Sequence, residues 1–324
     1  MLASHESLKD RTLIASSWIF FESVGVQGAR FVTGIILARL LSPEEFGLVA
    51  MVMVIIGVAQ PFLDGGFGGA LIQKKNINAL DINSVFYFNI FLGFIFSLSI
   101  FFLAPCISNF FNQPLLNNMT RALSFVLLIN SFGIIQIVIL TKNLNFKVQT
   151  KANLIACLFS GTIGITMALL GFGVWSLVAQ LITNALSSIF FLWFFNDWRP
   201  TLSFSLQSLR ELFSFGSRLM ASGILNIAFE NLYSLMIGKL FSARDLGLFS
   251  RANNLQGLPS NTLARLVERV SFPVFSTLQD NRSQLKSGIV KTVSTISLLN
   301  FPLMIGMAAV SKSLVFVLLG VKWI

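Results

Sequence analysis

Long uninterrupted apolar stretches dominate this 324-residue chain and restrict what it can fold into. A helix that crosses the hydrocarbon core of a bilayer needs about 20 mostly apolar residues. The stretches are continuous and do not alternate with a period of two, so they favour helices over the strands of a membrane barrel. We predict nine spans, at roughly Thr12–Leu40, Phe46–Ile72, Val85–Phe110, Ala122–Leu140, Leu154–Leu170, Val174–Phe195, Phe213–Leu240, Leu246–Phe275 and Ile289–Leu319.

The composition leaves too little polar surface for a soluble domain. Charged residues make up 11% of the chain and apolar residues 55%, whereas soluble domains carry about a quarter charged residues. A soluble fold of this composition would expose large apolar patches. The same composition argues against a disordered chain, a secreted disulfide scaffold and a nucleic-acid-binding protein. We therefore predict an all-α integral membrane protein that has membrane lipids and no nucleic acid among its partners.

The distribution of basic residues predicts the orientation of the chain. Lysine and arginine gather in the cytoplasmic loops of membrane proteins, and this reading also accounts for the net charge of +10. If the N-terminus is cytoplasmic, twelve basic residues lie on the inner side and five on the outer side. The twelve are Lys9, Arg11, Lys74, Lys75, Lys142, Lys147, Lys151, Arg199, Arg210, Arg282, Lys286 and Lys291, and the five are Arg39, Arg121, Lys239, Arg244 and Lys322. This bias favours a cytoplasmic N-terminus.

The connections between the predicted spans are too short to hold a catalytic domain. The longest, residues 196–212, contains a possible interfacial helix with Leu206, Leu209 and Phe213 on one face. The chain has no phosphate-binding loop, no zinc-protease or hydrolase motif and no clustered cysteine and histidine set. We therefore expect no enzyme activity, no cofactor and no metal site.

A repeated segment predicts how the spans are grouped. Residues 37–48 recur 200 positions later as residues 237–248, with Leu40, Ser42, Gly47 and Leu48 matched by identical residues. Six predicted spans separate the copies, and an even number makes the repeat parallel, with its pseudo-twofold axis along the membrane normal. The predicted organisation is a six-helix bundle over 1–195, a cytoplasmic linker over 196–212, and a second, truncated bundle of three helices over 213–324.

Charged residues inside the predicted spans are the candidate functional groups. A charge at the bilayer centre costs several kcal/mol unless it faces water or a partner. Arg30 and Glu230 occupy equivalent positions in the two repeats, each twelve residues before the shared serine. Arg218 and Arg251 lie in the first two spans of the second bundle, and Asp64 lies in the second span of the chain. The glycines around Asp64 favour close helix packing or a pliable helix end.

Six short segments together resemble one known family of exporters. They are Ala38–Gly47, Gly68–Lys74, Gly171–Val178, Trp198–Pro200, Leu246–Ala252 and Phe272–Ser276. In their order and spacing they resemble the polysaccharide-transporter branch of the multidrug/oligosaccharidyl-lipid/polysaccharide exporter superfamily. The resemblance implies a protein of the bacterial inner membrane that flips undecaprenyl-pyrophosphate-linked oligosaccharides for lipopolysaccharide or exopolysaccharide synthesis. Members usually have twelve or more helices, so nine is a departure from the family pattern.

The resemblance suggests roles for the charged residues. Guanidinium groups bind phosphate bidentately and stay charged when buried, so Arg30, Arg218 and Arg251 are predicted to bind the pyrophosphate in a hydrated cleft between the halves. Asp64 and Glu230 are predicted either to bind a coupling ion or to pair with one of these arginines.

Three other functions remain open at this stage. A drug or cation exporter of the same fold is the nearest. A scaffold that transports nothing, within a complex of other polysaccharide assembly proteins, is the second. A membrane-embedded polymerase or glycosyltransferase is the third, although the large outer loop or acidic metal motif that it needs is absent from the sequence.

Overall fold

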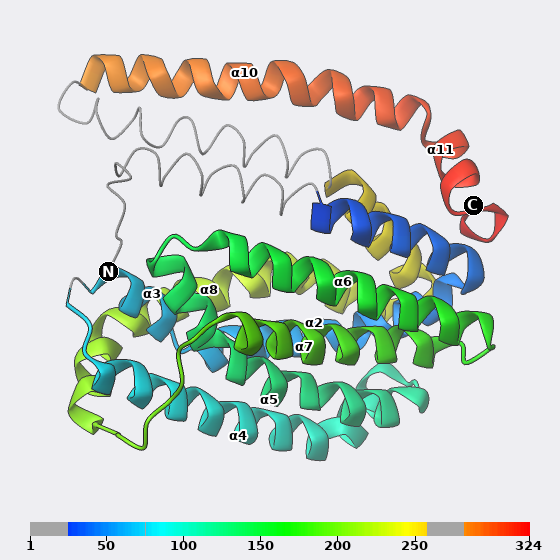
Figure 1. Ribbon diagram of the computed structural model, residues 1–324. Coiled ribbons are helices and arrows are strands. Elements are labelled where there is room, and N and C mark those ends of the chain that lie inside the picture. The colour runs from blue at the N-terminus through cyan, green and yellow to red at the C-terminus, as the bar shows by residue number, and fades with distance from the viewer. Residues whose placement is uncertain (1–24, 75, 258–281) are drawn as a thin grey trace. The chain divides into compact units, whose positions relative to one another are not determined.

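The computed structural model describes residues 25–74, 76–257 and 282–324, and every long element in this part of the chain is a helix (Figure 1). Within these described ranges, seven helices are long and apolar enough to cross a membrane. They are α2 (Pro43–Asp64), α4 (Ala79–Phe111), α5 (Leu115–Lys142), α6 (Phe146–Leu169), α7 (Val174–Phe195), α8 (Leu206–Leu240) and most of α10 (Arg282–Ala309). The shorter helical segments are residues 25–40, α3 (Phe67–Gln73), residues 243–257, α11 (Ser311–Leu318) and η1 (Val321–Trp323). The predicted all-α class of membrane protein is confirmed.

The nine predicted spans correspond to these helices with three differences. The spans at 12–40 and 246–275 lie partly outside the described residues, which are helical over 25–40 and 243–257. The span predicted over 46–72 is divided, because Gly65 and Gly66 adopt left-handed backbone angles (φ of 56° and 71°) that end α2 and begin α3. The span predicted over 289–319 is likewise divided at Val310, between α10 and α11.

The possible interfacial helix is not a separate element. The helix that begins after Ser205 continues without a break through residue 213 and ends at Leu240, so α8 combines linker and span in 35 residues. Its first turn is capped by the Ser205 hydroxyl, which accepts a hydrogen bond from the Ser208 amide at 3.2 Å.

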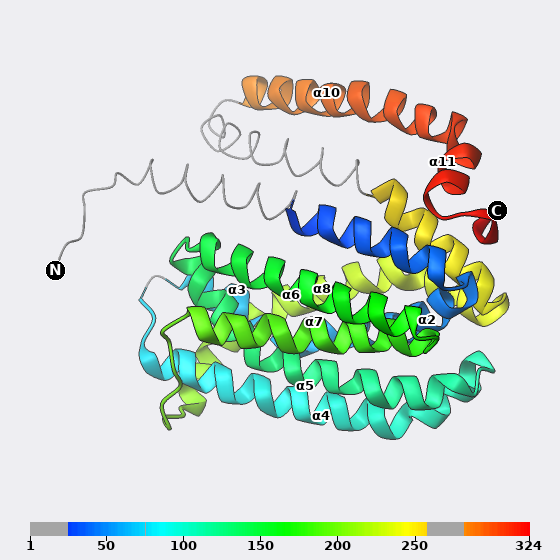
Figure 2. The same cartoon turned by 45° about the vertical axis from the view of Figure 1, so that its right-hand side comes forward.

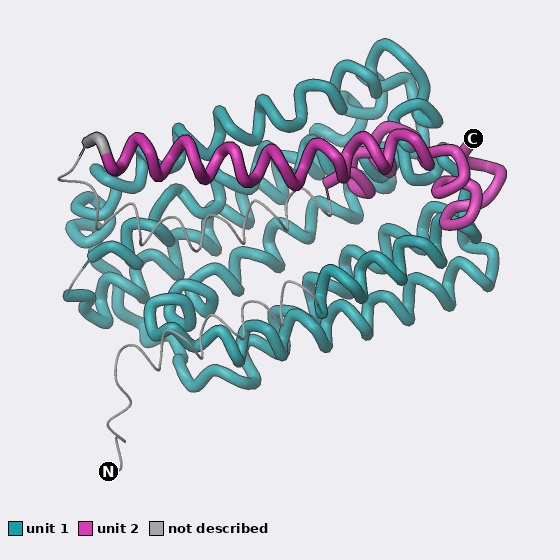
Figure 3. Tube along the Cα trace, turned by 90° about the horizontal axis from the view of Figure 1, so that it is seen from above, with its two compact units in different colours: residues 1–247 teal, residues 248–324 magenta. Residues whose placement is uncertain are grey.

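The described chain forms two compact units, residues 1–247 and 248–324 (Figure 3). In the first unit the long helices run side by side, as two views show (Figures 1 and 2). Helices α4 and α5 form one pair and α6 and α7 another, while α2 packs on α5 and α8. Among the largest fully buried side chains are Leu63 of α2, Phe67 of α3 and Leu127 of α5, so the interior of this unit is mainly apolar.

Helices α2 and α8 pack closely and in opposite directions. A Cβ atom added at Gly57 would lie 3.8 Å from Asn231, and one added at Gly223 would lie 3.7 Å from Pro61. At one end of the pair, a Cβ on Gly66 would lie 1.9 Å from the carbonyl oxygen of Gly216. Only glycine permits this approach, and small residues at helix interfaces in membranes typically serve this purpose. The close-packing interpretation of the glycine cluster is therefore confirmed.

The segment that joins α7 to α8 is bound to the first two turns of α4. Asn83, which is 2% exposed, donates to the hydroxyls of Thr201 (2.6 Å) and Ser203 (2.8 Å) and accepts from the Thr201 amide (3.3 Å). The Ser84 hydroxyl accepts from the Ser205 amide at 2.8 Å. The segment therefore has a fixed path before α8 begins.

Replacing Asn83 with alanine is expected to destabilise the first unit by about 2–3 kcal/mol, because buried partners lose their hydrogen bonds. The expected result is a lower unfolding temperature in detergent and faster cleavage of residues 196–205 by a nonspecific protease. Leu202, which is 98% exposed, provides the control, since Leu202→Ala removes no packing. An Asn83→Ala protein as stable and as protease-resistant as the control would show that this network contributes nothing.

Candidate functional site

A line of polar side chains winds around α8, a helix long and apolar enough to span a membrane. Ser214, Arg218, Ser222, Asn226 and Glu230 follow one another at intervals of four residues, and all five are exposed. Each step of four residues turns the position by about 40° around the helix, so this polar line covers about 160° of α8 from Ser214 to Glu230. The twelve residues from Arg218 to Glu230 correspond to about 18 Å along the axis. Charged groups over such a length are not stable against lipid, so the polar line requires a hydrated space or a polar partner.

The two charged residues of this line are held within α8 itself. The Arg218 Nε donates to the Ser214 carbonyl oxygen at 3.3 Å, and its guanidinium lies 5.8 Å from the centre of the Phe215 ring. The Glu230 Oε1 accepts from the side-chain nitrogen of Asn226 at 3.0 Å. Among the described residues, these contacts leave the terminal guanidinium nitrogens and the second carboxylate oxygen available to a ligand.

The charges of this polar line were predicted from the sequence, whereas its neutral members were not. Ser222 and Asn226 were not singled out, because a neutral polar residue in a span costs far less than a charge. Tyr233, which is 68% exposed, lies three residues beyond Glu230 and was also not predicted. The four-residue spacing from Ser214 to Glu230 was present in the sequence and indicates that each of these residues neighbours the next along the helix.

The other two predicted arginines lie apart from α8 in the chain. Arg30 is exposed on the helical residues 25–40, and its guanidinium lies beside the Cys157 thiol of α6. The same helix packs on α6 through Thr33, which lies 2.8 Å from where a Cβ on Gly161 would stand. Arg251 is half-buried in the second unit.

Asp64 has a structural task at the junction of α2 and α3. Its Oδ1 accepts from the Gly68 amide in the first turn of α3 at 3.1 Å. A carboxylate is favourable there because the N-terminus of a helix carries a partial positive charge. Neither Asp64 nor Glu230 forms an ion pair with an arginine of the described ranges.

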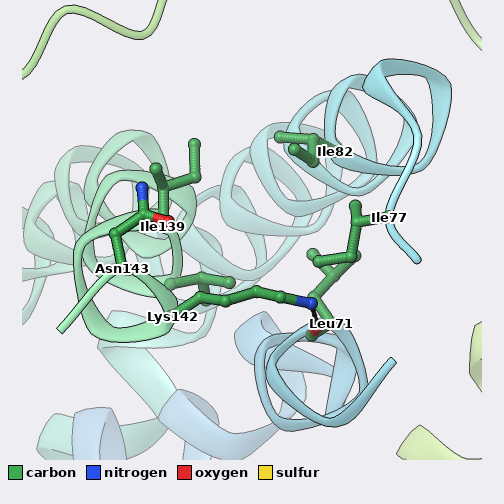
Figure 4. Close-up of a pocket in the computed structure, with 7 residues that line it drawn as sticks. Leu71, Ile77, Ile82, Ile139, Lys142 and Asn143 are labelled. Atoms are coloured by element: carbon green, nitrogen blue, oxygen red, sulfur yellow. Dashed lines mark hydrogen bonds between the residues drawn. The ribbon is translucent and has the colours of Figure 1, made fainter. Parts of the chain in front are cut away.

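A small pocket lies at the other end of α3 (Figure 4). It has a volume of about 290 Å³ and is lined mainly by Leu71, Ile77, Ile82 and Ile139. The Lys142 ammonium at its edge donates to the carbonyl oxygens of Leu71, at 3.2 Å, and Lys74. Lys142 therefore stabilises the C-terminus of α3, as a cation does at a helix end, and the pocket offers few polar groups to a ligand.

The described residues contain no group of three or more histidine, cysteine, aspartate or glutamate side chains that could hold a metal ion. The polar line of α8 is instead a series of hydrogen-bonding groups with one guanidinium and one carboxylate. Such a series is suited to a polar ligand that is bound through hydrogen bonds and has an anionic group at the guanidinium.

Known proteins similar to this chain have names connected with polysaccharide biosynthesis. The lipopolysaccharide biosynthesis protein WzxC of Escherichia coli is 28% identical in an alignment 327 residues long, which covers 98% of this chain and 65% of WzxC. The succinoglycan biosynthesis transport protein ExoT of Rhizobium meliloti is 28% identical over 306 residues, covering 94% of this chain and 62% of ExoT. The chain thus spans somewhat less than two thirds of the length of these relatives.

The fold is similar to that of a solved flippase. The lipid II flippase MurJ, in an inward closed conformation, superposes with a TM-score of 0.68 and 14% identity. The match covers 95% of this chain and 67% of MurJ. A family model described as polysaccharide biosynthesis protein matches residues 36–324. Because the match takes in nearly all of the described residues, the chain belongs to this family of multi-pass membrane proteins for polysaccharide biosynthesis.

Proposed function

We propose that this chain translocates an undecaprenyl-pyrophosphate-linked oligosaccharide across the bacterial cytoplasmic membrane for the synthesis of a surface polysaccharide. The observation that carries the proposal is the exposed polar line of α8, from Ser214 to Glu230, in a family of polysaccharide biosynthesis proteins. A glycan head group with an anionic pyrophosphate must cross about 30 Å of hydrocarbon. Groups that replace its water over a comparable length lower the cost of that crossing.

Arg30, Arg218 and Arg251 are the proposed pyrophosphate ligands. Each is a guanidinium on a separate helical segment, and both Arg30 and Arg218 are exposed. The Glu230 carboxylate is proposed either to bind a coupling ion or to pair in turn with such an ion and with a guanidinium. The capping contact of Asp64 with α3 accounts for that carboxylate without an ion, so Glu230 is the better candidate of the two.

The proposed arrangement follows the repeated segments of the sequence. Residues 1–195 form the first bundle, residues 196–212 a cytoplasmic connection, and residues 213–324 part of a second bundle. The N-terminus is cytoplasmic, as the bias of twelve basic residues against five predicts. Cysteines introduced at positions 78 and 145 are then expected to react with an impermeant thiol reagent only after the cell is opened, and labelling of both in intact cells would contradict this orientation.

Deletion of the gene tests the function in cells. The expected result is an accumulation of lipid-linked oligosaccharide and a loss of surface polysaccharide, both reversed by the parent chain. Unchanged lipid-linked sugar with increased sensitivity to cationic dyes would instead identify a drug exporter. Full complementation by a chain in which Arg30, Arg218 and Arg251 are all replaced by alanine would indicate a scaffold that needs no substrate-binding arginine.

A further inference from the structure

The two copies of the repeated segment fold alike in atomic detail. The Ser42 amide and hydroxyl donate to Glu45 at 2.7 and 2.9 Å, and the Ser242 amide and hydroxyl donate to Asp245 at 3.1 and 2.5 Å. In return, each serine hydroxyl accepts from the amide three residues later, at 3.4 and 3.1 Å. Both segments therefore begin a helix with a capping box. The hydrogen bonds from Ser242 also hold the pKa of Asp245 below its usual range, so this cap persists into acid.

These two helix beginnings touch through backbone atoms, and the contact is reciprocal. A Cβ on Gly47 would lie 1.6 Å from the Ala243 carbonyl oxygen and 3.0 Å from the Gly247 nitrogen. A Cβ on Gly247 would lie 1.8 Å from the Pro43 carbonyl oxygen and 3.1 Å from the Gly47 nitrogen. Exchange of the two segments reproduces the same contacts, which is what a local twofold axis between them requires.

No side chain other than hydrogen fits at either glycine. The atoms in the way are backbone carbonyls fixed by the first turn of each helix, so they are not free to rotate aside. Overpacking of this kind costs about 1–3 kcal/mol or more. The contact is therefore available only to a chain with glycine at both positions.

A second contact lies at the same end of α8. The Lys239 ammonium donates to the Phe110 carbonyl oxygen at the end of α4, at 2.5 Å, and lies 4.7 Å from the centre of the Phe110 ring. One turn further into the membrane, Met51 of α2 is 1% exposed and packs near Gly238. Met51 therefore lies one helical turn from Gly47 along α2, and its neighbour Gly238 directly precedes Lys239.

We propose that the Gly47–Gly247 contact is the closure of the substrate path at the end that the basic-residue bias predicts to be periplasmic. The proposal rests on the proposed translocation function. A translocated head group needs a path that is closed at one end while it is open at the other. Closure by glycine backbones brings the two segments together with no bulky side chain, so that nothing obstructs the path once they separate.

The test measures how accessible Met51 is from the periplasm. In a full chain with Cys106→Ser and Cys157→Ala, a reporter Met51→Cys is labelled in intact cells with an impermeant maleimide. Gly47→Ala and Gly247→Ala are each expected to raise the labelling rate at least about tenfold, which corresponds to about 1.4 kcal/mol. Because both act on one contact, the double variant is expected to exceed either single variant only slightly.

Two further variants make the result specific. Gly28→Ala adds a methyl group in a helix where nothing lies within 4 Å, and it is expected to label like the parent. Lys239→Met, which removes the second contact without overpacking, is expected to raise labelling about threefold, a smaller effect than the glycine variants because it removes one net hydrogen bond. Labelling at the parental rate in Lys239→Met and in whichever glycine variants reach the membrane would overturn the closure. The closure would also be overturned if the increases in labelling rate of the two single glycine variants multiplied in the double variant.

The closure and the translocation function fail in different ways. If the glycine variants expose Met51→Cys but gene deletion leaves lipid-linked sugar unchanged, the closure stands and the substrate is wrong. If deletion accumulates lipid-linked sugar but Met51→Cys stays protected in every variant, the function stands and the closure is wrong.

Discussion

Replacing Gly66 with alanine is expected to leave little folded protein in the membrane. Gly66 has a φ of 71°, and a Cβ there would lie 1.9 Å from the Gly216 carbonyl oxygen of α8. A left-handed backbone costs a residue other than glycine about 1–2 kcal/mol, and overpacking adds about 1–3 kcal/mol. The sum of about 2–5 kcal/mol is a large share of the stability of a typical domain. The measurement is the amount of protein in the membrane fraction and its unfolding temperature in detergent.

A second glycine separates the two contributions. Gly171 has a φ of 83°, and nothing lies within 4 Å of a Cβ built there. Gly171→Ala is therefore expected to show only the backbone cost, about 1–2 kcal/mol. Equal losses for Gly66→Ala and Gly171→Ala would mean that the contact between Gly66 and Gly216 does not limit the packing of α2 on α8.

Replacing Arg218 with alanine is expected to reduce surface polysaccharide export by about ten- to a hundredfold. This factor corresponds to the loss of a charge-assisted hydrogen bond that contributes about 1.5–3 kcal/mol to substrate binding. Arg30→Ala is expected to behave similarly. The lysine variants are expected to recover only part of the activity, since an ammonium is a point charge and does not bind phosphate through two parallel hydrogen bonds. Export is measured as surface polysaccharide per cell, at equal amounts of the chain in the membrane.

Arg210 provides the matched control for this series. It lies on the same helix two turns before Arg218, it is exposed, and it falls in the predicted cytoplasmic connection. Arg210→Ala is expected to export normally. Normal export by Arg218→Ala would remove that arginine from the site, and an equal loss in Arg210→Ala would point to a general effect of the positive charge.

The helices were predictable because long apolar stretches have few alternatives in a membrane. Their interruptions were harder to predict, because hydropathy does not register a left-handed pair such as Gly65–Gly66 when Phe62 and Phe67 on either side remain apolar. The continuity of α8 was also not predicted. Its first turns look like a separate interfacial helix, but no residue near position 213 ends the helix there.

The candidate site was predictable only in part. The cost of burying a charge selects Arg218 and Glu230 from the sequence alone, while Asn226 becomes recognisable through its hydrogen bond to Glu230. The capping role of Asp64 depends on the chain reversal at the glycines. The repeat identified Gly47 and Gly247 as equivalent, but their contact is a property of the folded chain.

The most direct measurement follows a lipid-linked oligosaccharide across a bilayer. The full chain is reconstituted into liposomes that contain a fluorescent undecaprenyl-pyrophosphate-linked oligosaccharide, and an impermeant reagent quenches the label on the outer leaflet. Without active protein, about half of the label stays protected. We expect the parent chain to make nearly all of the label accessible and Arg218→Ala to slow this change by at least about tenfold. Equal protection in liposomes with and without the parent chain would contradict translocation by this chain.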